Sequence, residues 1–457
     1  MTYSKTGRSL GVGPKITFCF NSVQVYKNGK RVLAVTIRFH ALDCTMEESF
    51  PFHYSLWEYL FSWVGLLFFL LDVVMDILTV VSLYQEENYV SMGLMIFFLL
   101  GSSVLLQIFS WVWYSDSLDE LETKVEKFAK KKKLIKPFHF LQLGVYLRYT
   151  GLMEISTTHF FRQTNTFTEG VAVYLSHDLQ MLRLFEAFSE SAPQLILMMT
   201  LTLQRGELEI LTGLKLLSSV ASIASTVTTY HRGMRAFLED KHKMRWTSTA
   251  FYFLWNFLLM IPRVAALALF CSVFPCYITA HFLSSWMVLV LVAWSQKTDL
   301  MKSHWEWLYR ATVGLIWYFS WFNVSEGSIK LKSVVYYSLM GLDTILLLGF
   351  WCWKVVEYAD SWSTLNPYIV VPTLLGLYVI GILVEIIYYR WFHPTCDKNK
   401  IAEPSKPTPI FKVDSVGFRN TTDSGDFEGS PAIADEGPAP PVTGAVKRSR
   451  TLAANFF

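Results

Sequence analysis

The sequence has few charged residues for its length. Only 17% of its 457 residues are Asp, Glu, Lys or Arg, whereas 52% are hydrophobic and 16% are aromatic. A water-soluble protein needs more polar surface than this composition provides, so the chain is predicted to reside in a membrane. The formal net charge of +3 suits contact with an anionic leaflet but decides nothing by itself.

Several functional motifs are missing. The sequence contains no GxxxxGK[ST] loop for binding a nucleotide, and no nucleophile and base at a spacing that would indicate an enzyme. Its six cysteines show no CxxC or Cys/His spacing, so we expect neither a metal site nor a secreted disulfide framework, and no cofactor. The first fifty residues lack the continuous apolar run of a cleavable signal peptide, and we expect the chain to start in the cytosol.

Long apolar stretches dominate the rest of the chain, and each is long enough to cross the hydrocarbon core. Two shorter ones, 137–155 and 307–323, each follow a basic loop and are predicted to be re-entrant half-helices. The fold class is therefore an all-α polytopic membrane protein with about eight transmembrane helices plus two short re-entrant half-helices, in two pseudo-related halves. The predicted spans are 55–84, 89–114, 178–204, 210–230, 247–273, 277–295, 333–357 and 367–391. This division places both termini and every Lys-rich loop in the cytosol, as the positive-inside rule requires.

Three parts follow from this division. Residues 1–52 form a cytosolic N-terminal arm, in which Asn28-Gly29 is a good hairpin turn between two short alternating stretches. Residues 53–396 form the transmembrane domain. Residues 397–457 change to Pro, Ser, Thr, Gly and acidic residues without apolar periodicity, and are predicted to be a disordered cytosolic tail.

The stretch 178–204 is apolar enough to span a bilayer, yet it contains a polar stripe. Arg183, Glu186, Glu190 and Gln194 fall within about 80° of one another on a helix. An ionisable group at bilayer depth costs on the order of 3 kcal/mol and usually lines a pathway or meets a partner. Pro193 is expected to bend the helix just past Glu190. A plainer alternative is a structural ion pair between Arg183 and Glu186, which leaves the second carboxylate uncompensated.

Other ionisable residues lie at membrane depth as well. Glu58, Asp72 and Asp76 share one face of the first span; alternatively, Glu58 marks the interface and the two aspartates cap or pair locally. Arg263 follows Pro262 near the middle of its span and requires an anion, for which Glu186, Glu190 or the first-span acids are the expected partners. Asp343 lies at mid-depth in a later span. The basic run 130–133 fits a lipid-headgroup or nucleic-acid patch, but such a run beside a span is usually a topology signal.

Four segments in the same order resemble the XK family of membrane proteins. They are LRLFEAFSESAPQL (182–195), FLWNFLLMIPRVAALALF (253–270), WLYRATVGLIWYFSWFNVSEG (307–327) and YYRWFHP (388–394). The resemblance covers roughly residues 55–396. It implies eight crossing helices with two half-length ones, and intramembrane charges at positions already chosen for their cost: Glu58, Asp72, Asp76, Glu186, Glu190, Arg263 and Asp343.

The resemblance also implies a function and partners. Activated members move phospholipids between leaflets without ATP, exposing phosphatidylserine on dying cells. A single-span immunoglobulin-type chaperone, basigin or neuroplastin, is implied for transport to the plasma membrane, and no nucleic-acid partner is expected. An executioner caspase is implied to cleave the tail. Two positions fit, Asp426 in the DxxD spacing 423–426, which is slightly preferred, and Asp414 before the small Ser415; a third possibility is that neither is cut.

These observations lead to a mechanism and to alternatives. We hypothesise that the two acidic stripes, with Arg183 and Arg263, line a groove that hydrates a lipid headgroup while the acyl chains stay in lipid. The lipid-pathway residues are then Glu58, Asp72, Asp76, Arg183, Glu186, Glu190, Arg263 and Asp343. The alternatives are an ion or solute transporter using intramembrane carboxylates and a non-catalytic membrane partner subunit.

Overall fold

The chain divides into two units, Met1–Ser49 and Phe50–Phe457. The structure is a computed structural model, and both candidate cleavage positions, Asp414 and Asp426, lie outside the residues it describes. Those residues are 22–27, 30–35, 56–116, 121, 123–162, 166–206, 210–236, 244–296, 298, 305–324, 329–357 and 365–393.

The first unit contains a β-hairpin. Strands β1 (Ser22–Lys27) and β2 (Lys30–Val35) pair antiparallel, with Lys27 opposite Lys30 and Ser22 opposite Val35. This register leaves the two residues 28–29 for the turn, which confirms the hairpin predicted from Asn28-Gly29.

The described part of the second unit is helical, and six of its helices are long and apolar enough to cross a membrane. They are α1 (Leu56–Gln85), α2 (Tyr89–Asp116), α9 (Trp246–Val273), α10 (Pro275–Ser295), α12 (Ile329–Glu357) and α13 (Pro367–Ile387). Local signals set several helix ends: Pro275 and Pro367 each begin a helix, and Asn366 caps α13 through its side chain, which accepts a hydrogen bond from the Tyr368 amide. A helical multi-pass membrane protein is therefore confirmed.

The two remaining predicted spans are less apolar helices inside the bundle. Residues 178–204 belong to α6 (Thr166–Glu186), a π-helical turn η1 (Ala187–Ser191) and α7 (Ala192–Arg205), and 210–230 belong to α8 (Ile210–Ala236). Their charged residues, and the Ser and Thr residues of α8, lower their hydropathy. Neighbouring helices cover much of both: Leu182, Leu184 and Phe185 of α6 and Ala224 of α8 are fully buried. Such segments need less apolar surface than a helix in contact with lipid.

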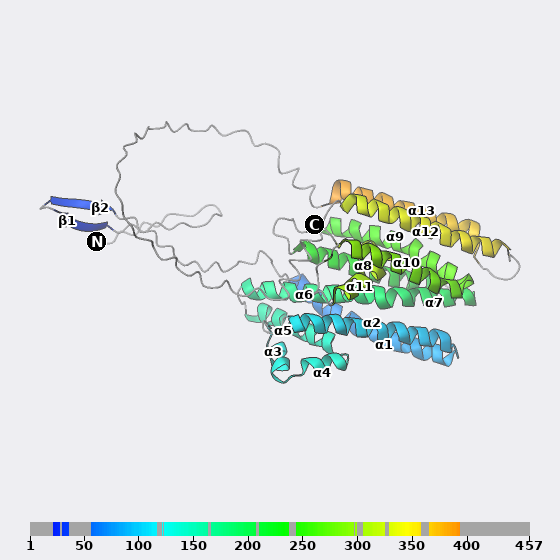
Figure 1. The fold of residues 1–457 in the computed structure, drawn as a ribbon, viewed down its shortest axis with the longest axis horizontal. Coiled ribbons are helices and arrows are strands. Elements are labelled where there is room, and N and C mark those ends of the chain that lie inside the picture. The colour runs from blue at the N-terminus through cyan, green and yellow to red at the C-terminus, as the bar shows by residue number, and fades with distance from the viewer. Residues whose placement is uncertain are drawn as a thin grey trace, which may run out of the picture. The chain divides into compact units, whose positions relative to one another are not determined.

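Helix α9 lies at the centre of the bundle and packs against α7, α8, α10, α12 and α13. The pair α1 and α2 lies on one side of it, and the pair α12 and α13 lies on the other (Figure 1). Ala265, Ala266 and Ala268 are buried in α9, and their small side chains allow neighbouring backbones to approach closely. In contrast, α1 and α10 expose most of their apolar side chains, which is expected of helices that contact lipid tails.

Short helices fill both halves of the bundle. Helix α3 (Lys124–Lys131) is followed by α4 (Ile135–Phe140) and α5 (Gly144–Arg162), which replace the single stretch predicted over 137–155. The turn between α4 and α5 reaches the middle of α2, where Ser103 Oγ donates to Gln142 Oε1 at 2.7 Å. Ser103 lies about 20 Å along α2 from its last residue, Asp116, at 1.5 Å per residue. This turn is therefore far from the C-terminal end of α2.

Helix α11 (Glu306–Trp317) has an equivalent course along α10. Arg310, near the start of α11, donates to Thr298, which lies just beyond the end of α10. Gly314 of α11 packs against Val290 of α10. Past its end, Tyr318 Oη lies 2.9 Å from His281 Nδ1 in α10. Both short predicted segments are therefore helices packed against the bundle, α4 and α5 against α2, and α11 against α10.

Candidate functional site

Two helices present matching ladders of side chains to each other. Phe69, Asp72 and Asp76 of α1 follow the spacing i, i+3, i+7, and so do Arg183, Glu186 and Glu190 of α6 and η1. The guanidinium of Arg183 lies 5.1 Å from the centre of the Phe69 ring, and Arg183 Nη1 donates to Glu186 Oε2 at 2.7 Å. The predicted stripe on the α6–α7 segment therefore faces the predicted stripe on α1.

The inner rungs of these ladders are closed to solvent. The carboxyl groups of Asp76 and Glu190 are neighbours, and only 6% of either residue is exposed. Glu190, the carboxylate that an Arg183–Glu186 pair leaves over, therefore lies beside Asp76 of α1. Arg183 and Asp72 remain partly exposed.

A π-helical turn interrupts the helix at the predicted position. In η1 the amide of Ala192 donates to Ala187 O, one residue further back than in an α-helix. Pro193 follows directly, and its ring and missing N–H disfavour the regular hydrogen bond to Ser189. The carbonyl before this turn, Phe185 O, accepts from Ser189 Oγ at 2.8 Å. The structure thus shows a π-helical turn that contains Glu190, beside the proline for which a bend was predicted.

Apolar side chains close the cluster beyond Asp76. Leu83 of α1, Met95 of α2 and Leu201 of α7 form a small buried cluster nearer the α1–α2 turn. Past it, the guanidinium of Arg205 forms an ion pair with Glu86. These contacts join the ends of α1, α2 and α7, whereas α1 packs elsewhere against α2 and α5.

A second polar cluster lies in the other half of the bundle. Arg263 Nη1 donates to Asp343 Oδ2 at 2.5 Å, and Arg263 Nε donates to Tyr318 O at 3.0 Å. His281 Nε2 lies 3.0 Å from Asp343 Oδ1, and the other ring nitrogen faces Tyr318. Helices α9, α10 and α12 and the chain after α11 are joined here. Arg263 is 3% exposed and Asp343 is 28% exposed, so the cluster opens to the surface only at its carboxylate.

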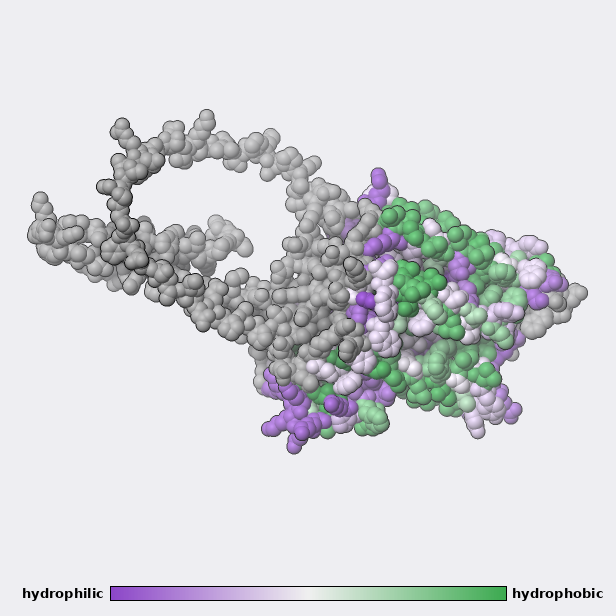
Figure 2. Space-filling view, in the orientation of Figure 1, coloured by the Kyte–Doolittle hydropathy of each residue, from purple (hydrophilic) through white to green (hydrophobic). Residues whose placement is uncertain are grey.

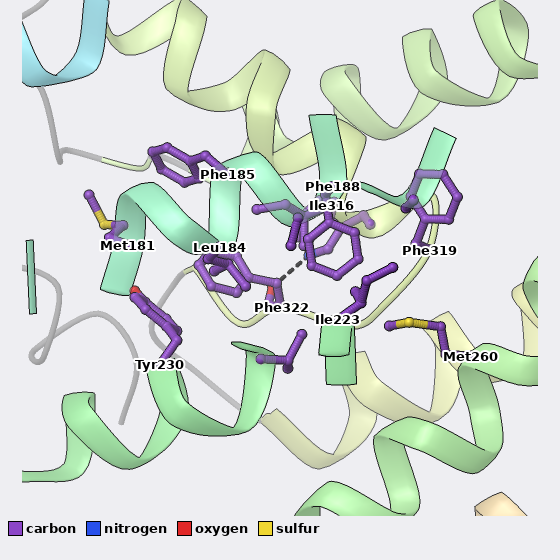
Figure 3. Close-up of a cluster of buried hydrophobic side chains, with 14 of the residues drawn as sticks. Met181, Leu184, Phe185, Phe188, Ile223, Tyr230, Met260, Ile316, Phe319 and Phe322 are labelled. Carbon is purple, nitrogen blue, oxygen red and sulfur yellow. Dashed lines mark hydrogen bonds between the residues drawn. The ribbon is translucent and has the colours of Figure 1, made fainter. Parts of the chain in front are cut away.

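The expected partners of Arg263 were wrong. Its anion is Asp343, and the acids of α1 and of η1 belong to the first cluster. Figure 3 shows the reason: Phe188 of η1 lies among aromatic and aliphatic side chains, including Phe319 and Met260. The Phe188 and Phe319 rings stack at 5.9 Å, so apolar packing fills the space between the two clusters.

Sequence reasoning missed several polar contacts of these clusters. His281 is the only ionisable side chain apart from Tyr and Cys in the span 275–295, and that isolation in an apolar helix was a usable signal. Arg148 of α5 forms a buried ion pair with Asp178 of α6 at 3.1 Å, near the start of the polar stripe. Glu58 lies in the first turn of α1, but its side chain is outside the described part.

Among the described residues, no group of three His, Cys, Asp or Glu side chains is placed to hold a metal ion. The chemistry available at both clusters is therefore that of hydrogen bonds and paired charges at membrane depth. Seven of the eight predicted pathway residues divide between the clusters, five in the first (Asp72, Asp76, Arg183, Glu186, Glu190) and two in the second (Arg263, Asp343).

Comparison with known proteins gives matches over most of the chain. Residues 60–394 match the family described as XK-related protein. The chain is similar to relatives named XK-related protein 8. It is 40% identical to the one from Tetraodon nigroviridis, over 82% of this chain and 93% of the relative. It is 38% identical to the one from Gasterosteus aculeatus, over 78% of this chain and 89% of the relative. The one from Pan troglodytes is 35% identical, over 73% of this chain and 83% of its own length.

Proposed function

The chain belongs to the XK-related family, and from this premise we propose that it is an ATP-independent phospholipid scramblase that exposes phosphatidylserine at the cell surface. One observation carries the proposal: charged and polar side chains of α1 and of α6–η1 form facing ladders in the interior of the bundle. Buried ionisable groups in a membrane are costly, and a structural role would be served by apolar packing at lower cost.

The barrier to lipid exchange explains what such ladders supply. A phospholipid headgroup must cross about 30 Å of hydrocarbon, whereas its tails are stable throughout that layer. Polar side chains along the crossing replace part of the headgroup's hydration and lower this barrier. Arg183 can meet the phosphate, and the carboxyl groups of Asp72, Asp76, Glu186 and Glu190 can meet an amine. No step requires ATP.

The route runs between α1 and the η1–α7 segment. Helix α1 exposes much of its surface, and its ties to α7 are the apolar cluster around Leu83 and the ion pair of Glu86 with Arg205. Because Asp76 and Glu190 are enclosed, the arrangement described here is the closed one. Separation of α1 from η1 would move these two carboxyl groups apart and admit headgroups. Arg263 and Asp343 would line a separate polar site in the other half of the bundle, which is exposed only at its carboxylate.

The remaining parts of the proposal follow the family. The chain crosses the plasma membrane eight times, with α4–α5 and α11 as the re-entrant segments and both termini in the cytosol. An executioner caspase cleaves the tail after Asp426 or Asp414 and so releases the closed state during apoptosis. A single-span immunoglobulin-type chaperone, basigin or neuroplastin, accompanies the chain to the cell surface. The positions of the short helices, which begin at the basic end of the bundle, support this topology.

Lipid scrambling by the purified chain tests the proposal. The protein is reconstituted into liposomes with a fluorescent lipid, and dithionite is used to bleach the label that reaches the outer leaflet. We expect little exchange by the intact chain and fast exchange after caspase treatment. The double variant Asp414→Ala with Asp426→Ala should stay inactive. Intact protein after caspase treatment would sink the activation step.

Charge variants then test the route. Glu190→Gln, and Asp72→Asn combined with Asp76→Asn, are expected to slow scrambling by the cleaved chain, because they remove charge from the facing ladders. Glu357→Gln is the matched control, since this exposed acid lies at the end of α12. Unchanged scrambling with a lower yield would show that the charges are structural. Cation-dependent current without lipid movement would favour a transporter, and a cleaved chain that never scrambles would favour a partner subunit.

A further inference from the structure

The α3–α4 segment presents a basic and aromatic face. Between Lys124 and Lys136 there are seven lysines and a single acid, Glu126. All seven lysines are exposed, and Glu126 is buried. Lys124, Lys127 and Lys131 share one side of α3 at the spacing i, i+3, i+7. Phe128 lies beside them with 57% of its surface exposed.

The opposite face of this segment is fixed to the bundle. Glu126 accepts hydrogen bonds from Tyr114 Oη of α2 and from Thr123 Oγ1, both at 2.8 Å. The carboxylate of Glu154 in α5 accepts from the amides of Lys124 and Val125 at 3.0 and 2.8 Å. These contacts hold α3 against α2 and α5, so the lysines cannot turn inward. Their outward position is a property of the fold.

The apolar part of the face continues onto α4 and the turn after it. Phe140 is 86% exposed, and Leu141 and Leu143 are exposed beside it. Figure 2 shows hydrophilic surface where α3 lies and hydrophobic surface next to it, where α4 lies. Because Tyr114 lies in the last turn of α2, its contact with Glu126 places α3 beside the end of that helix.

We propose that the α3–α4 face docks on the anionic headgroups of the cytosolic leaflet, with phosphatidylserine as the occupant. Lysines at the interface attract anionic lipid, and exposed aromatic and aliphatic side chains beside them insert into the leaflet. The lysines are all exposed along this segment, and residues 124–136 contain no arginine, which suits a layer of singly charged headgroups. The face thereby concentrates phosphatidylserine next to α5.

The selectivity of the full chain for spin-labelled lipids tests this inference. In liposomes of phosphatidylcholine, electron paramagnetic resonance separates lipid held at the protein surface from bulk lipid. We expect the wild-type chain to prefer labelled phosphatidylserine over labelled phosphatidylcholine by about threefold at low salt. The preference should fall toward unity in 1 M salt, where the screening length is about 3 Å.

Two sets of variants locate the preference. Lys124→Gln, Lys127→Gln and Lys131→Gln combined should lower it to below about 1.5-fold, whereas Lys215→Gln with Lys354→Gln, two lysines away from this segment, should leave it unchanged. Each of the three α3 substitutions made alone should lower the preference for phosphatidylserine by part of this amount. A wild-type chain without the preference, or a triple variant that keeps it, overturns the inference. Because this measurement needs no lipid translocation, failure of the proposed scrambling would leave it intact.

Discussion

The pair of Arg263 and Asp343 allows a quantitative test of how charges are held inside this bundle. Asp343→Leu would leave a guanidinium that is 3% exposed without its carboxylate. Removing one partner of a buried pair costs about 3–5 kcal/mol, and the partial exposure of Asp343 places the expected cost just below that range, at about 2–3 kcal/mol. Arg263→Met should cost less, about 1–2 kcal/mol, because His281 still faces the remaining carboxylate at 3.0 Å.

The double variant distinguishes pairing from packing. With both charges replaced by apolar side chains, no uncompensated charge remains, and the loss should be below about 2 kcal/mol. We expect the apparent unfolding midpoint in detergent, followed by tryptophan fluorescence, to drop by several degrees in Asp343→Leu and to recover in part when Arg263→Met is added. A double variant that loses the full sum of the single losses would refute the reasoning.

An exposed pair on the same helix provides the control. Lys354 Nζ lies 3.6 Å from Glu357 Oε2, and both side chains contact solvent. Surface pairs contribute at most about 1 kcal/mol, so Glu357→Leu should shift the midpoint little. A shift as large as that of Asp343→Leu would show that burial is not what makes the inner pair important.

Three further predictions concern packing, capping and the π turn. Gly314→Ala should destabilise the fold by about 1–3 kcal/mol, because a Cβ there would lie 2.7 Å from Val290 Cγ2; Gly101→Ala, which has open space, should be neutral or stabilising in the same thermal assay. Glu154→Gln should weaken the start of α3 by about 1 kcal/mol, because it loses its charge on the amides of Lys124 and Val125; faster hydrogen exchange in α3 would register this, and unchanged exchange would contradict it. Pro193→Ala should favour a regular helix through 187–191 and turn Gln194 relative to Glu190, so cleaved protein should scramble more slowly at similar stability. Equal scrambling would mean that the π turn does not set the route.

Much of the fold was accessible from local sequence signals. Long apolar stretches marked the six helices that are long and apolar enough to cross a membrane, and Asn28-Gly29 marked the hairpin. The helices begin at Pro275 and Pro367, close to the predicted span starts at 277 and 367, and proline is suited to the first turn of a helix. Residues 137–155 were harder to interpret: a turn with Gln142 in the left-handed region divides them into two helices. A non-glycine residue in that conformation gives little warning in a sequence.

The polar site shows the same division. The cost of an ionisable group at membrane depth identified the acidic residues and arginines of both clusters, because such a group in an apolar span is visible without a structure. It did not select their partners. Arg263 met Asp343 because helices α9 and α12 are neighbours, and the aromatic layer around Phe188 keeps it from Glu190. His281 completes that cluster, although nothing in its own span predicted a contact with Asp343.

Sequence alone determined that this chain is a helical membrane protein. It also determined which ionisable residues lie in apolar helices at a cost in free energy, and that proline disturbs one helix near Glu190. These are properties of single segments, set by hydropathy, helical period and proline. Only the tertiary structure decided which charges meet, that Asp76 and Glu190 close on each other, and that the lysines of α3 face outward. Such choices depend on which helices become neighbours, and that depends on packing across the whole bundle.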